Sequence, residues 1–129
     1  MATLIGSVDP RGRPLVRLEG KHESVLVLID TGFNGELMLT RDAARLVGAD
    51  SFYDEAEIEL ADGRTARVFE GRATITWLGN ERRVRVFVSD ERFTHRSDEP
   101  AGLLGAGLLA PNLLTIDFAA GTVTIESRA

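Results

Sequence analysis

The sequence contains no cysteine and only two histidines, His22 and His95. Without cysteine the chain forms no disulfide, no thiolate nucleophile and no zinc site of the cysteine type. The two histidines do not stand at the spacing of metal ligands, and neither has a sequence context that suggests nucleophilic catalysis. We therefore expect no metal site and no cofactor.

Positive charge is scarce, and long apolar runs are absent. The 129 residues carry 20 acidic and 15 basic side chains, a formal net charge of -5 at pH 7. An acidic domain argues against nucleic acid or an anionic membrane as a partner, and the cluster Arg82, Arg83 and Arg85 is too small to change this. No stretch approaches the roughly 18 apolar residues of a membrane span, and the N-terminus does not resemble a signal peptide. We expect a single cytoplasmic domain spanning residues 1–129.

Most of the chain alternates apolar and polar residues between turn signals, which is typical of half-buried strands. The pair Asp62-Gly63 predicts a tight hairpin turn that projects from the body of the domain. Residues 89–100 are polar and lack an apolar period, which predicts an exposed loop. The pattern predicts an all-β fold, with strands at Leu4 to Val8, Leu15 to Leu18, Glu23 to Ile29, Glu36 to Leu39, 55–60, 73–77, 84–88, Leu113 to Phe118 and Thr122 to Glu126.

Two short helices interrupt the strands. Thr40 can cap a helix from Arg41 to Val47, and Gly48 is placed as its left-handed stop. A second helix, from about Ala106 to Ala110, ends before Pro111. The sequence thus predicts an all-β domain with one or two short helices.

The residue with the clearest chemical potential is Asp30, which follows the continuous apolar run 25–29 directly. A carboxylate at the end of a buried strand must be hydrogen-bonded, paired or functional, because burying an isolated charge costs several kcal/mol. Asp30 and Thr31 could simply cap a turn. They could also carry chemistry, and the tripeptide Asp30-Thr31-Gly32 alone does not decide between the two.

The surrounding sequence resembles the catalytic segment of the retropepsin-like aspartic proteases. The similarity covers the strand before Asp30-Thr31-Gly32, the following Phe33-Asn34-Gly35, the returning strand 36–39 and the capped helix. Later, Ala101-Gly102-Leu103-Leu104-Gly105 resembles the second signature of the family, two large apolar residues followed by glycine. This resemblance implies a closed, barrel-like acid-protease fold.

The resemblance also implies roles for individual residues. Asp30 would be the catalytic aspartate, Thr31 would lock two active-site loops across a dimer axis, and Gly32 would permit their close approach. The hairpin at Asp62 and Gly63 would be the flap over the substrate, and Leu104 would lie beneath the catalytic loop. The residues expected to bind substrate are Phe33, Asn34, Gly35, Asp62, Gly63 and Leu104.

The chain departs from the viral pattern at three places. Phe33 and Asn34 replace the alanine and acidic residue that viral members commonly carry, so substrate preference cannot be transferred. Ala106 stands where the viral enzymes place an arginine. The flap candidate has one glycine, Gly63, where viral flaps are glycine-rich, which suggests a stiffer or shorter cover.

A single Asp-Thr-Gly predicts a homodimer. Peptide hydrolysis by carboxylates needs one ionised group that takes a proton from water and one neutral group that donates a proton. Two adjacent carboxylates can share one proton and supply this pair, so the partner of Asp30 must come from a second chain. We expect a two-fold homodimer that acts on peptide or protein substrates, with the terminal strands of the two chains interleaved.

Two other functions stay open at this point. The chain could be a catalytically silent module of the same fold that dimerises or binds peptides, because fold alone does not imply activity. It could also be an unrelated β-barrel in which Asp30-Thr31-Gly32 is accidental. The intact tripeptide favours an active endopeptidase over the silent module, and the atypical flap keeps the module open. The accidental motif is the weakest of the three hypotheses.

Overall fold

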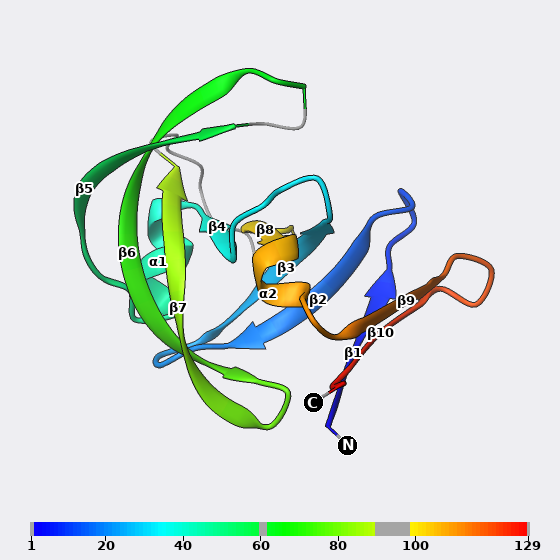
Figure 1. The fold of residues 1–129 in the computed structure, drawn as a ribbon. Coiled ribbons are helices and arrows are strands. Elements are labelled where there is room, and N and C mark those ends of the chain that lie inside the picture. The colour runs from blue at the N-terminus through cyan, green and yellow to red at the C-terminus, as the bar shows by residue number, and fades with distance from the viewer. Residues whose placement is uncertain (1, 60–61, 90–98, 129) are drawn as a thin grey trace.

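The computed structural model describes residues 2–59, 62–89 and 99–128. In these residues the chain forms ten strands and two short helices (Figure 1). The strands are β1 (Thr3–Val8), β2 (Pro14–Glu19), β3 (Ser24–Asp30), β4 (Leu37–Leu39), β5 (Asp50–Glu59), β6 (Thr65–Trp77), β7 (Asn80–Ser89), β8 (Gly102–Gly105), β9 (Leu113–Asp117) and β10 (Thr122–Glu126). The helices are α1 (Arg41–Leu46) and α2 (Ala106–Leu109).

Six of the strands close into a barrel in the order β6, β7, β4, β8, β3 and β2. The ring closes where β2 meets β6, at the pair Glu19 and Thr76. Two neighbouring pairs are parallel, β3 with β8 and β4 with β7, whereas β4 and β8 run antiparallel. The prediction of an all-β, barrel-like fold with two short helices is confirmed.

The chain ends form a sheet that extends from β2 outside the barrel, seen at the right of Figure 1. β1 pairs with β10 over five residue pairs, from Thr3 with Glu126 to Ser7 with Thr122, and β10 pairs with β9 on its other side. Both edges of β10 are therefore occupied within one chain. We expected the strands Leu4 to Val8 and Thr122 to Glu126 to interleave with a second copy because they need covering. Within one chain these two strands pair with each other, so this reason for interleaving does not apply.

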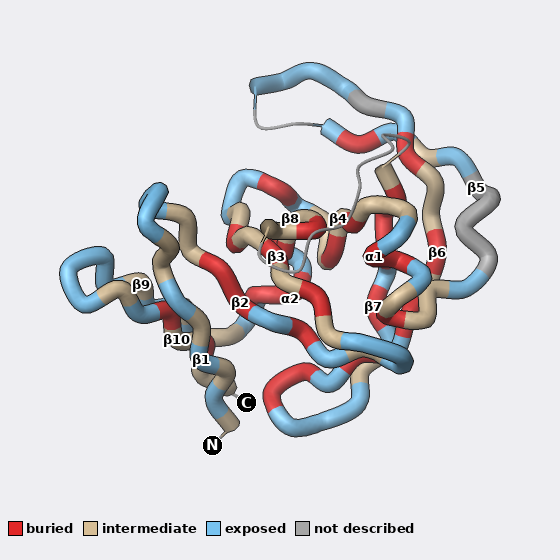
Figure 2. Tube along the Cα trace, turned by 180° about the vertical axis from the view of Figure 1, so that it is seen from behind, coloured by how far each residue is buried: buried red, intermediate tan, exposed pale blue. Residues whose placement is uncertain are grey.

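The core fills the barrel and continues under the terminal sheet (Figure 2). Alternation along β3 buries Val25, Val27 and Ile29, and β10 contributes Val123 and Ile125 in the same way. Burying a side chain of this size contributes about 1.5–3 kcal/mol, so these strands are the main source of stability. They hold the end of β3, and with it Asp30, in a fixed position.

Helix α1 forms as its sequence signals predict. The Thr40 side chain accepts a hydrogen bond from the backbone N–H of Ala43 at 3.2 Å, which satisfies one free donor of the first turn. Gly48 has φ +81, the left-handed conformation that ends helices. Ala43 and Ala44 are fully buried, so the helix closes the side of the barrel beside β4.

The structure differs from the sequence-based expectation at several strands. β6 begins at Thr65 and β7 at Asn80, eight and four residues before their predicted starts. β5 begins at Asp50, five residues before the predicted start, and pairs with β6 along almost its whole length with a register shift between Asp50 and Asp54. Gly102–Gly105 was expected only as the approach to a helix, but it is the strand β8 in the middle of the barrel. Most of the predicted loop 89–100 lies outside the described residues.

No helix in the part of the chain that the structure describes is long and apolar enough to cross a membrane. The cytoplasmic location stays a prediction.

Candidate active site

Asp30 is the last residue of β3 and lies beside Gly105, the last residue of β8. Its Oδ1 accepts a hydrogen bond from the backbone N–H of Gly32 at 3.0 Å, and its backbone oxygen accepts one from Phe33 N at 3.2 Å. The carboxylate thus closes a turn with its own backbone, as aspartate often does. One carboxylate oxygen, Oδ2, takes no part in this turn.

The sequence led us to expect a buried carboxylate, but Asp30 is only half-buried, and Thr31 and Gly32 are exposed. The strand buries Ile29 just before it, and the chain then turns outward. In one chain the tripeptide therefore lies at the surface with its turn already formed. The turn-capping role of Asp30 is confirmed, and it leaves the carboxylate accessible to a reactant or to a second chain.

β8 supports this turn from below. Leu104 pairs with Ile29 and is fully buried, so its side chain cannot contact a substrate, and the expectation that it binds substrate is wrong. It packs in the core beneath the turn, as the family resemblance also implied. At Gly105 a Cβ atom would lie 2.2 Å from the carbonyl oxygen of Gly35, so only glycine fits between the two segments.

Phe33 is an internal support of the active-site loop (residues 30–36). Its side chain is only 5% exposed, although sequence reasoning assigned it to substrate binding. The ring fills the space above Gly35 and Gly105 and meets the ring of Phe87 edge-on, with 6.2 Å between centroids. With Ile58 and Val68 of the β5–β6 hairpin, these two rings form a small second core. This cluster joins the loop to the base of the hairpin.

The β5–β6 hairpin rises above the active-site loop, at the top of Figure 1. In its turn Gly63 has φ +85, and Asp62 Oδ1 accepts a hydrogen bond from the backbone N–H of Arg64 at 3.0 Å. The Asp62 carboxylate also pairs with the Arg64 guanidinium at 2.6 Å. Both turn residues are exposed, and a substrate contact of Asp62 and Gly63 stays a prediction.

A groove of about 240 Å³ separates the loop from the hairpin. Its floor is formed by Phe33, Asn34 and Gly35, and its walls come from the hairpin and from β7. Asn34 is exposed there and Gly35 is partly exposed. The structure thus places the three predicted substrate-binding residues of the loop along one groove, where Asn34 offers a polar side chain, whereas the Gly35 carbonyl already accepts a hydrogen bond from Gly107 N at 3.1 Å.

Glu36 is a loop residue whose role the sequence did not reveal. Its carboxylate accepts a hydrogen bond from the backbone N–H of Arg85 at Oε1 and another from the Arg82 guanidinium at Oε2, both at 2.9 Å. Its backbone oxygen accepts one from Gly105 N at 3.0 Å. Glu36 therefore ties the active-site loop to β7 and β8 at once. In the sequence, the only sign that charged side chains gather on one face of β7 was the alternation of Arg83 and Arg85 in the predicted strand.

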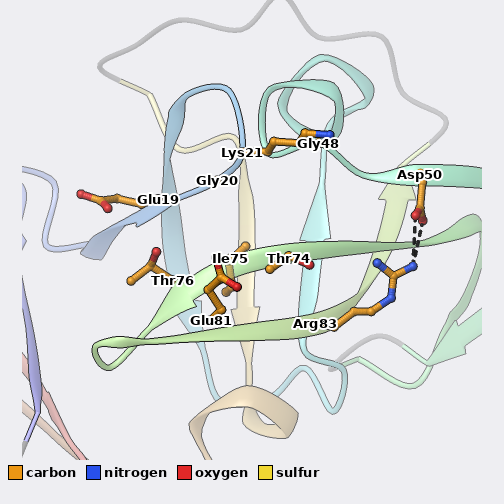
Figure 3. A pocket seen from close by; sticks show the side chains of 10 residues that line it. All are labelled: Glu19, Gly20, Lys21, Gly48, Asp50, Thr74, Ile75, Thr76, Glu81 and Arg83. Atoms are coloured by element: carbon orange, nitrogen blue, oxygen red, sulfur yellow. Dashed lines mark hydrogen bonds and ion pairs between the residues drawn. The ribbon is translucent and has the colours of Figure 1, made fainter.

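A second hollow, of about 550 Å³, lies elsewhere, and no residue of the active-site loop lines it (Figure 3). At its rim the Arg83 guanidinium donates to both carboxylate oxygens of Asp50, at 3.0 and 3.4 Å, joining β7 to β5. This hydrogen bond is the main cause that lowers the pKa of Asp50 below its usual value. Glu19, Lys21, Thr74 and Thr76 line the hollow but are exposed to solvent.

The Asp50–Arg83 pair contributes to the free energy of unfolding in a way that depends on pH, and Asp50→Asn should remove this contribution. Because the folded pKa is lowered, the contribution is present above the unfolded value of about 4 and is lost as the pH falls through the folded pKa. Urea unfolding at pH 7, 5, 3 and 2 should show the parent more stable than the variant at pH 7 and 5, with the difference shrinking as the pH falls further. In the Arg83→Gln background the same substitution should have no further effect. An equal difference at pH 2 and pH 7 would contradict this assignment.

No family model matches the sequence, and no curated protein matches it. Solved structures do match the fold. A retropepsin-like aspartic protease from Rickettsia conorii superposes with a TM-score of 0.63 at 16% identity, over 95% of this chain and 87% of that chain. EIAV protease, solved in complex with the inhibitor HBY-793, has a TM-score of 0.57 at 24% identity, over 78% of this chain and 88% of that chain.

Both structures are proteases, the first of them a retropepsin-like aspartic protease, and the similarity extends over most of their lengths. At identities of 16% and 24%, these superpositions show that the fold is shared. They do not show whether the residues of the candidate site have the same roles. In this chain the barrel holds the turn at Asp30, and the β5–β6 hairpin lies above that turn. This chain has the fold of the retropepsin-like aspartic proteases.

Proposed function

We propose that the chain is one subunit of a homodimeric aspartic endopeptidase in which two Asp30 carboxylates activate water. The observation that carries the proposal is the accessible Asp30 carboxylate at the end of a buried strand, beside an exposed Thr31-Gly32. The next residues of the same loop, 33–35, line a groove together with residues of the β5–β6 hairpin. The fold, which a retropepsin-like aspartic protease and EIAV protease share, supports it.

The proposed chemistry needs two carboxylates in different protonation states. The ionised one takes a proton from water, which then attacks the peptide carbonyl, while the neutral one donates a proton to the carbonyl oxygen. The backbone N–H of Gly32 already donates to Asp30 Oδ1. This hydrogen bond orients the carboxylate before substrate binds, so Oδ2 is left for the partner carboxylate and water.

A second chain would supply the other carboxylate. Thr31 and Gly32 are exposed in one chain, as residues at a two-fold contact must be before association. The terminal sheet is a further candidate contact, because Ile5 and Phe118 are 72% and 64% exposed and β9 forms an outer edge of the sheet. In this proposal the strands of each terminal sheet pair within their own chain, and the two complete sheets then contact each other.

The substrate would be an extended peptide in the groove between the loop and the hairpin. The exposed Asn34 side-chain amide offers hydrogen-bonding groups along its floor. An extended strand satisfies such groups through its own backbone, which gives affinity with little dependence on sequence. The hairpin would close over the peptide and exclude water, and Asp62 and Gly63 at its turn would make this cover.

The test is proteolysis by the purified chain of a denatured protein mixture, between mildly acidic and neutral pH. We expect cleavage that a statine-type inhibitor suppresses and whose specific rate rises with protein concentration as dimer forms. Sedimentation on the same samples gives the dimer fraction. A dimer without cleavage would indicate a silent binding module, and a chain that stays monomeric at high micromolar concentration would remove the enzymatic proposal.

A further inference from the structure

Arginine side chains gather next to the groove on the outer face of β6 and β7. A hollow of about 510 Å³ adjoins the groove, and both are lined by Asn34, Gly35, Arg85 and Phe87. Arg72 and Arg83 also line the hollow. A chain with net charge -5 therefore places three guanidiniums beside its candidate active site.

Two of these arginines stand directly opposite each other. Arg72 of β6 and Arg85 of β7 are cross-strand partners. Like charges in this position destabilise a sheet, so the arrangement works against folding unless something else requires it. Such local conflicts are expected at functional sites.

The acidic neighbours do not neutralise this cluster. One oxygen of Glu70 serves both arginines, at 3.0 Å from Arg72 Nη1 and 2.6 Å from Arg85 Nε. Asp50 is taken by Arg83. Three guanidiniums thus share Glu70 and Asp50. Glu36 also lines the hollow and pairs with a further arginine, Arg82, at 2.9 Å, so that four guanidiniums share three carboxylates. The face keeps a surplus positive charge.

Arg85 has donor capacity to spare. Its side chain is 52% exposed, and within the described residues its guanidinium makes one ion pair, through Nε. The Glu36 carboxylate contacts the Arg82 guanidinium and the backbone N–H of Arg85, and no ion pair joins it to the Arg85 guanidinium in the part of the chain that the structure describes. Glu59 lines only the groove, from the hairpin side, and does not line the hollow.

We infer that Arg85, with Arg72 beside it, forms a subsite that binds a carboxylate side chain of the peptide substrate near the scissile bond. The two terminal nitrogens of a guanidinium match the two oxygens of a carboxylate. A bound carboxylate would also relieve the repulsion between Arg72 and Arg85. The inference rests on the proposed function, since it assigns a substrate class to the same groove.

The experiment uses a library of peptides of known sequence, digested by the dimeric protein. We expect aspartate and glutamate to be enriched at one position near the cleaved bonds. Replacing that glutamate by glutamine in a single peptide should lower kcat/KM about tenfold, the effect of losing one charge-assisted hydrogen bond. Arg85→Gln should abolish the difference between the two peptides, and Arg85→Glu should shift the preference to lysine and arginine.

The matched control is Arg11→Gln, which removes an exposed arginine from the β1–β2 turn, outside the groove and the hollow. It should keep the acidic preference in full. Arg72→Gln should weaken the preference while the Tm stays equal or rises, because it removes the like-charge pair. A preference that survives Arg85→Glu in a variant with a parental circular dichroism spectrum would overturn the inference.

Binding separates this inference from the proposed function. The same library is passed over immobilised Asp30→Asn protein, and the retained peptides are sequenced. Acidic peptides should be retained, and the double variant Asp30→Asn/Arg85→Glu should not retain them. Cleavage without any acidic preference would refute the subsite and leave the protease proposal standing. If the variant binds acidic peptides selectively but the parent cleaves none, the subsite stands and the protease proposal is refuted. If acidic peptides are enriched in neither assay, the subsite is refuted.

Discussion

Replacing Asp30 with asparagine is expected to lower the rate of peptide hydrolysis by about 10²–10⁴-fold or more, because one substitution removes both members of the proposed catalytic pair. An amide neither accepts a proton from water at neutral pH nor donates one as a carboxylic acid does. The measurement is kcat/KM on one cleaved peptide, with parent and variant at equal dimer concentration. Retained cleavage would show that Asp30 is not the catalyst.

Folding and association should survive the same substitution. The asparagine side-chain oxygen can still accept the hydrogen bond from Gly32 N–H that Asp30 Oδ1 accepts now, and the residue is only half-buried. In the dimer the repulsion between two carboxylates would also disappear, so stability at neutral pH should equal or slightly exceed that of the parent. Loss of folding would mean that Asp30 acts in the turn alone.

Replacing Phe33 with alanine is expected to cost about 3–5 kcal/mol of unfolding free energy, the usual loss for a buried phenylalanine. The ring is 5% exposed, meets Phe87 edge-on, and fills the space above Gly35 and Gly105. Its removal leaves a cavity under the active-site loop, so activity should fall even at temperatures where the variant is folded. Urea unfolding and kcat/KM on the same preparations measure both effects.

Phe118→Ala is the matched control for the unfolding measurement alone, made on the monomer at low protein concentration, because Phe118 belongs to the proposed dimer contact. It deletes the same ring from a position that is 64% exposed, and such surface changes usually shift the free energy of unfolding by less than about 0.5 kcal/mol. A Phe33→Ala protein that is as stable as the parent, with only KM raised, would instead support the direct substrate contact that the sequence suggested for Phe33.

Local signals in the sequence determined the elements that depend on a few neighbouring residues. The Thr40 cap and the Gly48 stop fixed α1, because both act within one turn of helix. Period-two alternation located most strands, since it reflects one buried face. Asp30-Thr31-Gly32 after an apolar run identified the candidate site, because the strand end and the turn are both encoded there.

Tertiary structure decided everything that depends on residues far apart in the chain. β8 has four residues and two glycines, too few for a pattern, and it is a strand only because β3 and β4 flank it. Phe33 is buried because β7, β8 and the hairpin enclose it. Arg72 and Arg85 face each other only through the β6–β7 register. Pairing register and burial arise from contacts across the whole barrel, so the residue types alone located the turn at Asp30, whereas the fold decided what surrounds it.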